Sequence, residues 1–339
     1  MSTTIHRASQ RERVVPPGSR QRMSRAEPAP TWMTWAPPAA LAWALAYGAV
    51  RVWWAIDTPS FPPPQRTDLI AFTGWAAVGL CAATAVSALV LRRAGWHRSL
   101  LIAAWGISAA LLAASALVLL DIVGALFPGQ GVHFHFVAFV SRAGALAGAV
   151  LLGATAEAYR RRRRSACLFC GRSGIRIDSA QVPRWARWGA YVAIGGCLVR
   201  LGAQVAVGFE EMQGGGWSLV GFEAGFLLAG TILPLALVHS WGRVFPEWLP
   251  ALAGRRVPRW LLLGPGAGIG GLMTVYFGFT LIKIAIETVT GTWEPGDDPL
   301  PLTFFWVAVP AYLAWGLGLS AAAIGYERMT RPQCRICGR

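Results

Sequence analysis

Long apolar runs recur along the chain, and short polar or basic segments separate each run from the next. About 20 apolar residues in a helix span the ~30 Å hydrocarbon core of a bilayer. Only 14% of the residues are charged, whereas soluble domains contain about a quarter. A backbone in lipid must satisfy its own hydrogen bonds, so the spans should be helical. The sequence therefore predicts an all-α polytopic membrane protein.

Eight runs have the length of a transmembrane helix. Their approximate bounds are Pro38–Ile56, Leu69–Leu91, Ser99–Leu126, Val132–Ala158, Trp185–Val207, Trp217–Ser240, Arg259–Glu287 and Leu302–Tyr326. Proline lacks an N–H donor and disturbs a helix. Local kinks are therefore predicted at Pro234, Pro265 and Pro310, which lie inside or near the ends of three spans.

Basic residues gather in alternate connections between the spans. Both chain ends and the loops after the second, fourth and sixth spans carry many arginines, whereas Arg66 is the only base in the other loops. Those other loops contain Asp57, Asp68, Glu210, Glu211, Glu294, Asp297 and Asp298. The positive-inside rule then places both termini in the cytoplasm. We expect a cell-membrane protein, most simply of the bacterial plasma membrane.

The formal net charge of +15 does not indicate nucleic-acid binding, because the charge lies between hydrophobic runs and not on one soluble face. The arginine run at residues 160–164 should lie at the membrane surface. There it would orient the chain and attract anionic lipids. Membrane lipids are thus the expected partners, and no nucleic acid is expected.

The same cysteine motif follows the fourth and the eighth predicted span. In both places seven residues separate a tyrosine from the pattern Cys-x-x-Cys-Gly-Arg. The matched residues are Tyr159 and Tyr326, Cys167 and Cys334, and Cys170 and Cys337. Fainter matches join Arg51 to Arg200 and Asp121 to Lys283. This pattern predicts an internal duplication of four spans.

Four spans per half give both halves the same orientation, so the repeats should be parallel. The expected organisation has five parts. They are an Arg-rich disordered cytoplasmic tail at 1–35, a first four-helix repeat at 36–159, a cytoplasmic linker at 160–184, a second repeat at 185–326, and a cytoplasmic tail at 327–339.

Seven ionisable residues fall inside the predicted spans, in the outer half by the direction of each span. They are Arg51, Asp121, Arg142, Arg200, Glu223, Lys283 and Glu287. Each charge near a helix centre costs ~3 kcal/mol. One hypothesis is an outward-facing pocket, in which Asp121 pairs with Lys283 and the matched arginines bind an anionic group. The alternatives are charges that only pair with one another to hold the helices together, or a catalytic role.

The two cysteine motifs form the second candidate site. Two Cys-x-x-Cys turns supply four thiolates for a tetrahedral metal ion, with zinc the default and a single iron the other option. The duplication should bring Cys167, Cys170, Cys334 and Cys337 together as a cytoplasmic clamp between the halves. The rival interpretations are that these cysteines perform thiol redox chemistry or that they have no special role.

The segment from Ala46 to Ala55, Ala-Tyr-Gly-Ala-Val-Arg-Val-Trp-Trp-Ala, resembles the first span of uncharacterised multi-pass membrane proteins of high-GC actinobacteria. That resemblance implies no activity. Quinone-linked four-helix thiol oxidoreductases also carry Cys-x-x-Cys, but on the outer side, whereas these motifs are predicted inside.

The preferred hypothesis is therefore a protein that binds or transports an anionic small molecule or lipid headgroup, with halves clamped by zinc, or by iron in its place. A membrane thiol redox enzyme and a non-catalytic scaffold are the alternatives.

Overall fold

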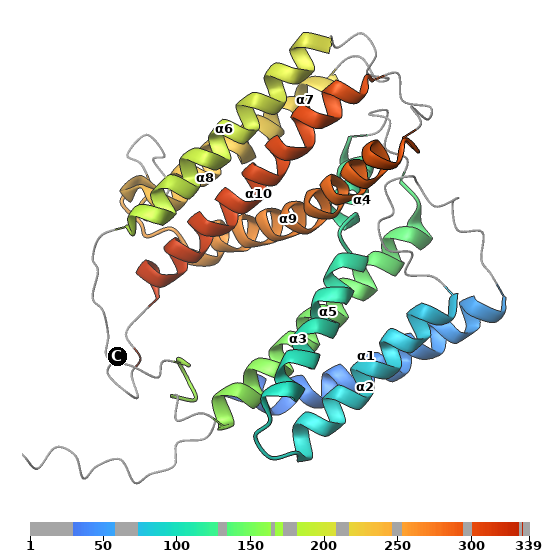
Figure 1. Cartoon of the computed structure of the whole chain (residues 1–339). Coiled ribbons are helices and arrows are strands. Elements are labelled where there is room, and N and C mark those ends of the chain that lie inside the picture. The colour runs from blue at the N-terminus through green and yellow to red at the C-terminus, as the bar shows by residue number, and fades with distance from the viewer. Residues whose placement is uncertain are drawn as a thin grey trace, which may run out of the picture.

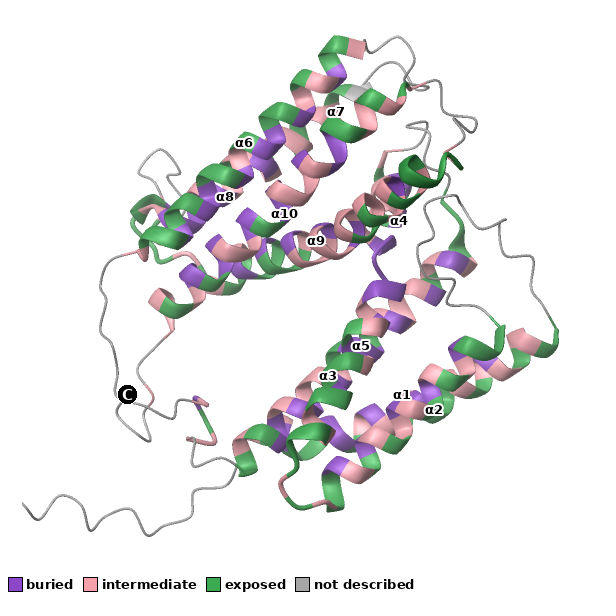
Figure 2. Cartoon of the chain, in the orientation of Figure 1, coloured by how far each residue is buried: buried purple, intermediate pink, exposed green. Residues whose placement is uncertain are grey.

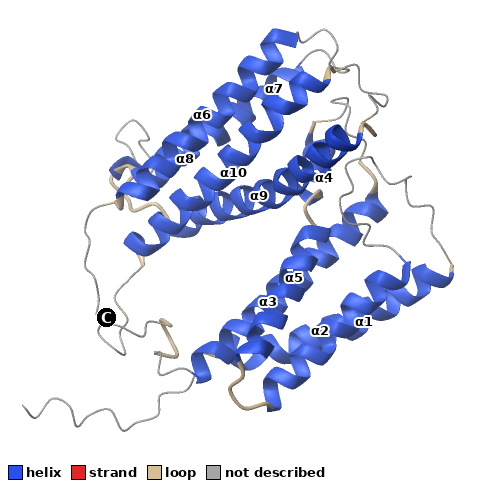
Figure 3. Ribbon diagram, in the orientation of Figure 1, coloured by secondary structure: helices blue, strands red, loops and turns tan. Residues whose placement is uncertain are grey.

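The computed structural model describes residues 30–57, 74–127, 134–163, 167–171, 182–207, 217–245, 253–293, 300–331 and 334. Within these ranges the chain is helical and contains no β-strand, apart from one isolated bridge (Figure 1, Figure 3). Eight helical stretches are long and apolar enough to cross a membrane. The prediction of an all-α polytopic membrane protein is therefore confirmed.

The helices are α1 (Thr31–Ile56), α2 (Gly74–Arg93), α3 (Arg98–Ala114), α4 (Val118–Leu126), α5 (Phe136–Arg163), α6 (Arg184–Val207), α7 (Trp217–Leu227), α8 (Leu233–Val238), α9 (Arg259–Thr290) and α10 (Leu302–Thr330). The third span consists of α3 and α4, and the sixth contains most of α7, a π-helical turn and α8. Helices α5 and α10 each continue four residues past the tyrosine expected to close its half.

Helix α1 begins earlier than expected, at Thr31, so the segment 1–35 is not wholly a tail. Pro37 lies inside this helix and has no N–H to donate to the carbonyl of Met33. That carbonyl instead accepts a hydrogen bond from Arg162 Nη2 at 2.6 Å. A side chain from α5 thus replaces the missing helical bond, and the helix continues through the proline.

The sixth span is irregular close to Pro234, where a local kink is predicted. A π-helical turn at Leu228–Ile232 directly precedes α8, and Pro234 is the second residue of α8. A wider turn accommodates the ring and the lost hydrogen bond. Pro265 and Pro310 lie inside α9 and α10, which continue past them without a break.

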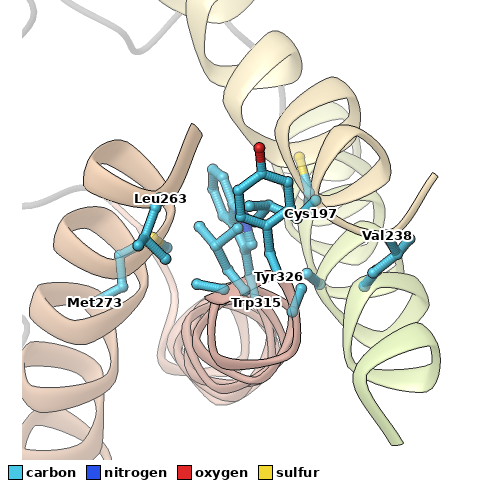
Figure 4. Packing of buried hydrophobic residues seen from close by; sticks show 12 residues of the cluster. Cys197, Val238, Leu263, Met273, Trp315 and Tyr326 are labelled. Carbon is cyan, nitrogen blue, oxygen red and sulfur yellow. The ribbon is translucent and has the colours of Figure 1, made fainter. Parts of the chain in front are cut away.

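The described helices form two groups (Figure 1). In one group α1 packs against α2 and α5, and α3 packs against α5; in the other, α10 packs against both α6 and α9. Trp315, Leu319 and Tyr326 of α10 are buried in the core of the second group (Figure 4). Large apolar side chains such as Leu45 and Ile102 are 63% and 71% exposed, which suits a lipid-facing surface (Figure 2).

The two groups meet where the third span is interrupted. Residues 115–117 form a turn between α3 and α4, and all three are buried. Ala116 and Leu117 of this turn pack with Tyr276 of α9. Beyond α4, the ring of Phe127 lies edge-on to Phe222 of α7, with centroids 5.9 Å apart. The break in the third span therefore lies at the contact between the halves.

Glycine allows α6 and α10 to pack closely. A methyl group at Gly196 would lie 2.4 Å from the carbonyl oxygen of Ala311, whereas a methyl at the neighbouring Gly195 would meet nothing within 4 Å. Small residues permit such close packing of membrane helices. We expect Gly196→Ala to lower the thermal unfolding midpoint in detergent clearly, because α10 must move away. Gly195→Ala should leave it unchanged or raise it slightly; equal losses in both variants would contradict this packing.

Candidate metal centre and buried ion pairs

Three thiols from the two cysteine motifs lie together. The Sγ atoms of Cys167, Cys170 and Cys334 are all within 4.8 Å of one another. Cys167 Sγ lies 3.8 Å from Cys334 Sγ, although the two residues are 167 positions apart in the chain. The predicted convergence of the motifs is thus observed for three of the four cysteines, and Cys337 lies outside the described residues.

The first motif has the backbone of a tight metal-binding turn. Gly171 donates its backbone N–H to the carbonyl of Cys167 at 2.7 Å. Its φ of +70° lies in the left-handed region, which glycine adopts without strain. A methyl group there would lie 2.8 Å from Arg161 Nε. The backbone conformation therefore favours glycine here, and a larger residue would also have to displace the guanidinium of Arg161.

Two arginines fix the motif to the helix ends. Arg161 Nη1 donates to the carbonyl of Phe169 at 3.1 Å, and its Nε bonds Glu157 one turn earlier in α5. Arg331, just after α10, donates to the carbonyl of Cys170 at 2.5 Å. The first cysteine turn is thus held by both halves of the chain.

The sulfur spacing suits a metal ion. Four thiolates at ~2.3 Å from a tetrahedral zinc ion lie about 3.8 Å apart, and the distance between Cys167 and Cys334 has this value. Cys170 is buried, and Cys167 and Cys334 are partly buried. The donor set is purely sulfur, which favours zinc or iron over magnesium and calcium. The residues present therefore fit a thiolate metal centre.

In the first half, the candidate charges of the spans contact neighbouring helices. Asp121 of α4, which is 3% exposed, forms an ion pair with Arg142 of α5. Arg51 of α1, which is 2% exposed, donates through Nη2 to the hydroxyls of Tyr47 at 2.8 Å and Ser141 at 2.5 Å. These contacts join the first, third and fourth spans.

In the second half, Arg200 of α6 is the centre of a buried network. Its Nη1 donates to both carboxylate oxygens of Glu223, at 3.0 and 3.2 Å, and its Nε donates to the hydroxyl of Tyr312 at 2.7 Å. The guanidinium also lies 4.5 Å from the ring centroid of Phe226. Three helices, α6, α7 and α10, thus meet at one charge.

The last two candidates, Lys283 and Glu287, lie one turn apart on α9. Lys283 Nζ is 4.0 Å from Glu287 Oε1, and the two side chains are 36% and 27% exposed. The seven candidates thus form separate ion pairs and hydroxyl contacts on several helices. The expected pair between Asp121 and Lys283 stays a prediction, and so does the outward-facing pocket. Each of those two residues takes part in an ion pair described above.

Sequence reasoning missed the hydroxyl partners of the arginines. Tyr47 lies four residues before Arg51 on α1, and this one-turn spacing was a usable signal. Tyr312 is 112 positions from Arg200. No local pattern could identify Tyr312, because only the packing of α10 against α6 brings it there.

Eight spans and a thiol cluster beside the ends of α5 and α10 define a polytopic membrane protein with a candidate metal centre. No protein family, curated protein or solved structure matches this chain. Its function therefore has to follow from the side chains themselves.

Proposed function

We propose that this protein is a metal-binding bacterial membrane protein, in which a four-cysteine centre on the cytoplasmic face clamps two parallel four-helix halves. Zinc is the preferred ion, and iron is the alternative. The single observation that carries the proposal is the gathering of Cys167, Cys170 and Cys334 from motifs at the ends of the two halves. Cys337 is the fourth ligand of the proposed centre.

The chemistry of a reducing compartment supports this role. Cytoplasmic thiols stay reduced, so cysteines that cluster there serve metal binding more readily than structural disulfides. The arginine-rich ends of α2 and α5 lie toward the same end of the first half as the cluster (Figure 1). The positive-inside rule assigns that end to the cytoplasm.

Thiol redox catalysis is the second reading of the same cysteines. A catalytic Cys-x-x-Cys exchanges electrons between its own two thiols. The 3.8 Å approach instead joins Cys167 of one motif to Cys334 of the other. A centre shared by two motifs favours a metal clamp, so redox chemistry becomes an outcome to be tested.

The anionic-ligand pocket receives less support. A buried ion pair such as Arg200 with Glu223 satisfies its own charges and joins helices. The geometry therefore favours the pairing role for the charges within the spans. Transport or binding through them, and a purely scaffolding role, remain hypotheses that carry no part of the proposal.

Metal analysis of the purified protein tests the clamp. We expect about one zinc or iron per chain, and replacement of Cys167, Cys170, Cys334 or Cys337 by serine should remove most of it. Cys81→Ser is the matched control, because Cys81 is buried among the helices of the first half. Metal-free wild-type protein would overturn the clamp, and a trapped mixed disulfide in Cys170→Ser would favour the redox reading.

A further inference from the structure

A second polar site lies in the first half, between the ends of α2 and α5 and the start of α1. A cavity of about 260 Å³ is present there, and residues of all three helices line it. Three of its lining residues are Arg92, Arg162 and Arg163, and none is acidic. Small-molecule pockets usually measure about 300–1,000 Å³, so this cavity lies near the small end of that range and has room for a group such as a lipid headgroup.

Within the described part of the chain, no carboxylate neutralises the arginines that line the cavity. The nearby carboxylate of Glu157 bonds Arg160 and Arg161 instead. Arg162 and Arg163 each use one nitrogen for a backbone carbonyl, at Met33 and Ala94 respectively. A guanidinium has five N–H donors, so these single bonds hold the side chains in place and leave further donors on each for a ligand.

The walls of the cavity combine this charge with apolar surface. Leu91 and Pro37, both buried members of spans, also line it. A charged group can thus lie at the helix ends while attached chains follow the apolar spans. Arginine forks match the oxygens of a phosphate, and the inner leaflet is rich in anionic lipids.

We propose that this cavity binds the phosphate headgroup of an anionic phospholipid. None of its lining residues is a cysteine, and the proposal does not depend on the metal centre. It also gives the arginine run at the end of α5 a specific role, since Arg162 and Arg163 line the headgroup site while Arg161 holds the cysteine turn.

Arg92→Glu and Arg93→Glu form a matched pair for the test. Both residues are exposed in the last turn of α2, but only Arg92 lines the cavity. Neither donates a side-chain hydrogen bond within the described ranges, so neither variant removes one. Native mass spectrometry of the full-length protein, titrated with phosphatidylglycerol or phosphatidylcholine, measures lipid retention directly.

We expect wild-type protein to retain one phosphatidylglycerol in preference to phosphatidylcholine. Arg92→Glu should weaken that retention about tenfold or more, and Arg93→Glu less than about threefold. Equal losses in both variants would reduce the effect to general surface attraction and overturn the site. Displacement of the lipid by millimolar inorganic phosphate would overturn the lipid assignment in favour of free phosphate. If Arg92→Glu fails to fold, Arg92→Gln and Arg93→Gln give the same comparison.

Discussion

Removal of metal by a chelator is expected to lower the thermal unfolding midpoint of the wild-type protein and to leave that of Cys334→Ser unchanged. A ligand that binds only the folded state stabilises it by about 4 kcal/mol when its free concentration is 1,000 times its Kd. Here Cys334 comes from the end of the second half, while Cys167 and Cys170 follow the first. Loss of the ion therefore removes one link between the halves, which also pack together at residues such as Leu117 and Tyr276.

The comparison between the two proteins is the decisive part of this experiment. Cys334→Ser should begin at the midpoint that chelated wild-type protein reaches, because both lack the same tie. Cys197→Ser, a change at a buried cysteine of α6, should keep its response to the chelator. Differential scanning fluorimetry in detergent measures the unfolding midpoint of all three proteins, each with added zinc and with chelator. A chelator response of equal size in Cys334→Ser would show that the effect arises elsewhere.

Hydropathy alone predicted the spans well, because a bilayer imposes one length on every helix. The details that differ all depend on distant residues. In α1, Arg162 bonds the carbonyl of Met33 that Pro37 leaves without a helical donor, and no pattern near Met33 contains that information. The turn between α3 and α4 likewise packs on Tyr276 of α9, far away in the sequence.

The two candidate sites differed in how far the sequence could predict them. Cys167 and Cys334 occupy matched places in two similar segments, so their convergence followed from the duplication that the sequence suggests. For the buried charges, a sequence match did not identify the bonding partners. Arg51 and Arg200 match in sequence and each donates to a tyrosine hydroxyl, but Tyr47 lies on the same helix as Arg51 whereas Tyr312 comes from α10. Partner identity depends on side chains from other helices.

Glu223→Gln is expected to destabilise the protein by about 3–5 kcal/mol, because it leaves the charge of Arg200 buried without its carboxylate. Arg200 is 5% exposed and bonds both oxygens of Glu223. The matched control is Glu287→Gln, since Glu287 and Lys283 are 27% and 36% exposed and 4.0 Å apart. That change should cost about 1 kcal/mol or less. Equilibrium unfolding in mixed detergent and SDS micelles measures both.

The double variant Arg200→Leu with Glu223→Gln separates a structural pair from a ligand site. If the pair serves only to join α6 and α7, removal of both charges should restore most of the stability lost in Glu223→Gln, because no uncompensated charge stays buried. The hydroxyl of Tyr312 would lose its guanidinium partner, so a cost of about 1 kcal/mol should persist. Additive losses from the two changes would instead mean that Arg200 stabilises the fold without Glu223. A strongly stabilised double variant would mean that the pair is kept at a cost to stability, and binding of an anion by Arg200 would then regain its place as the leading explanation.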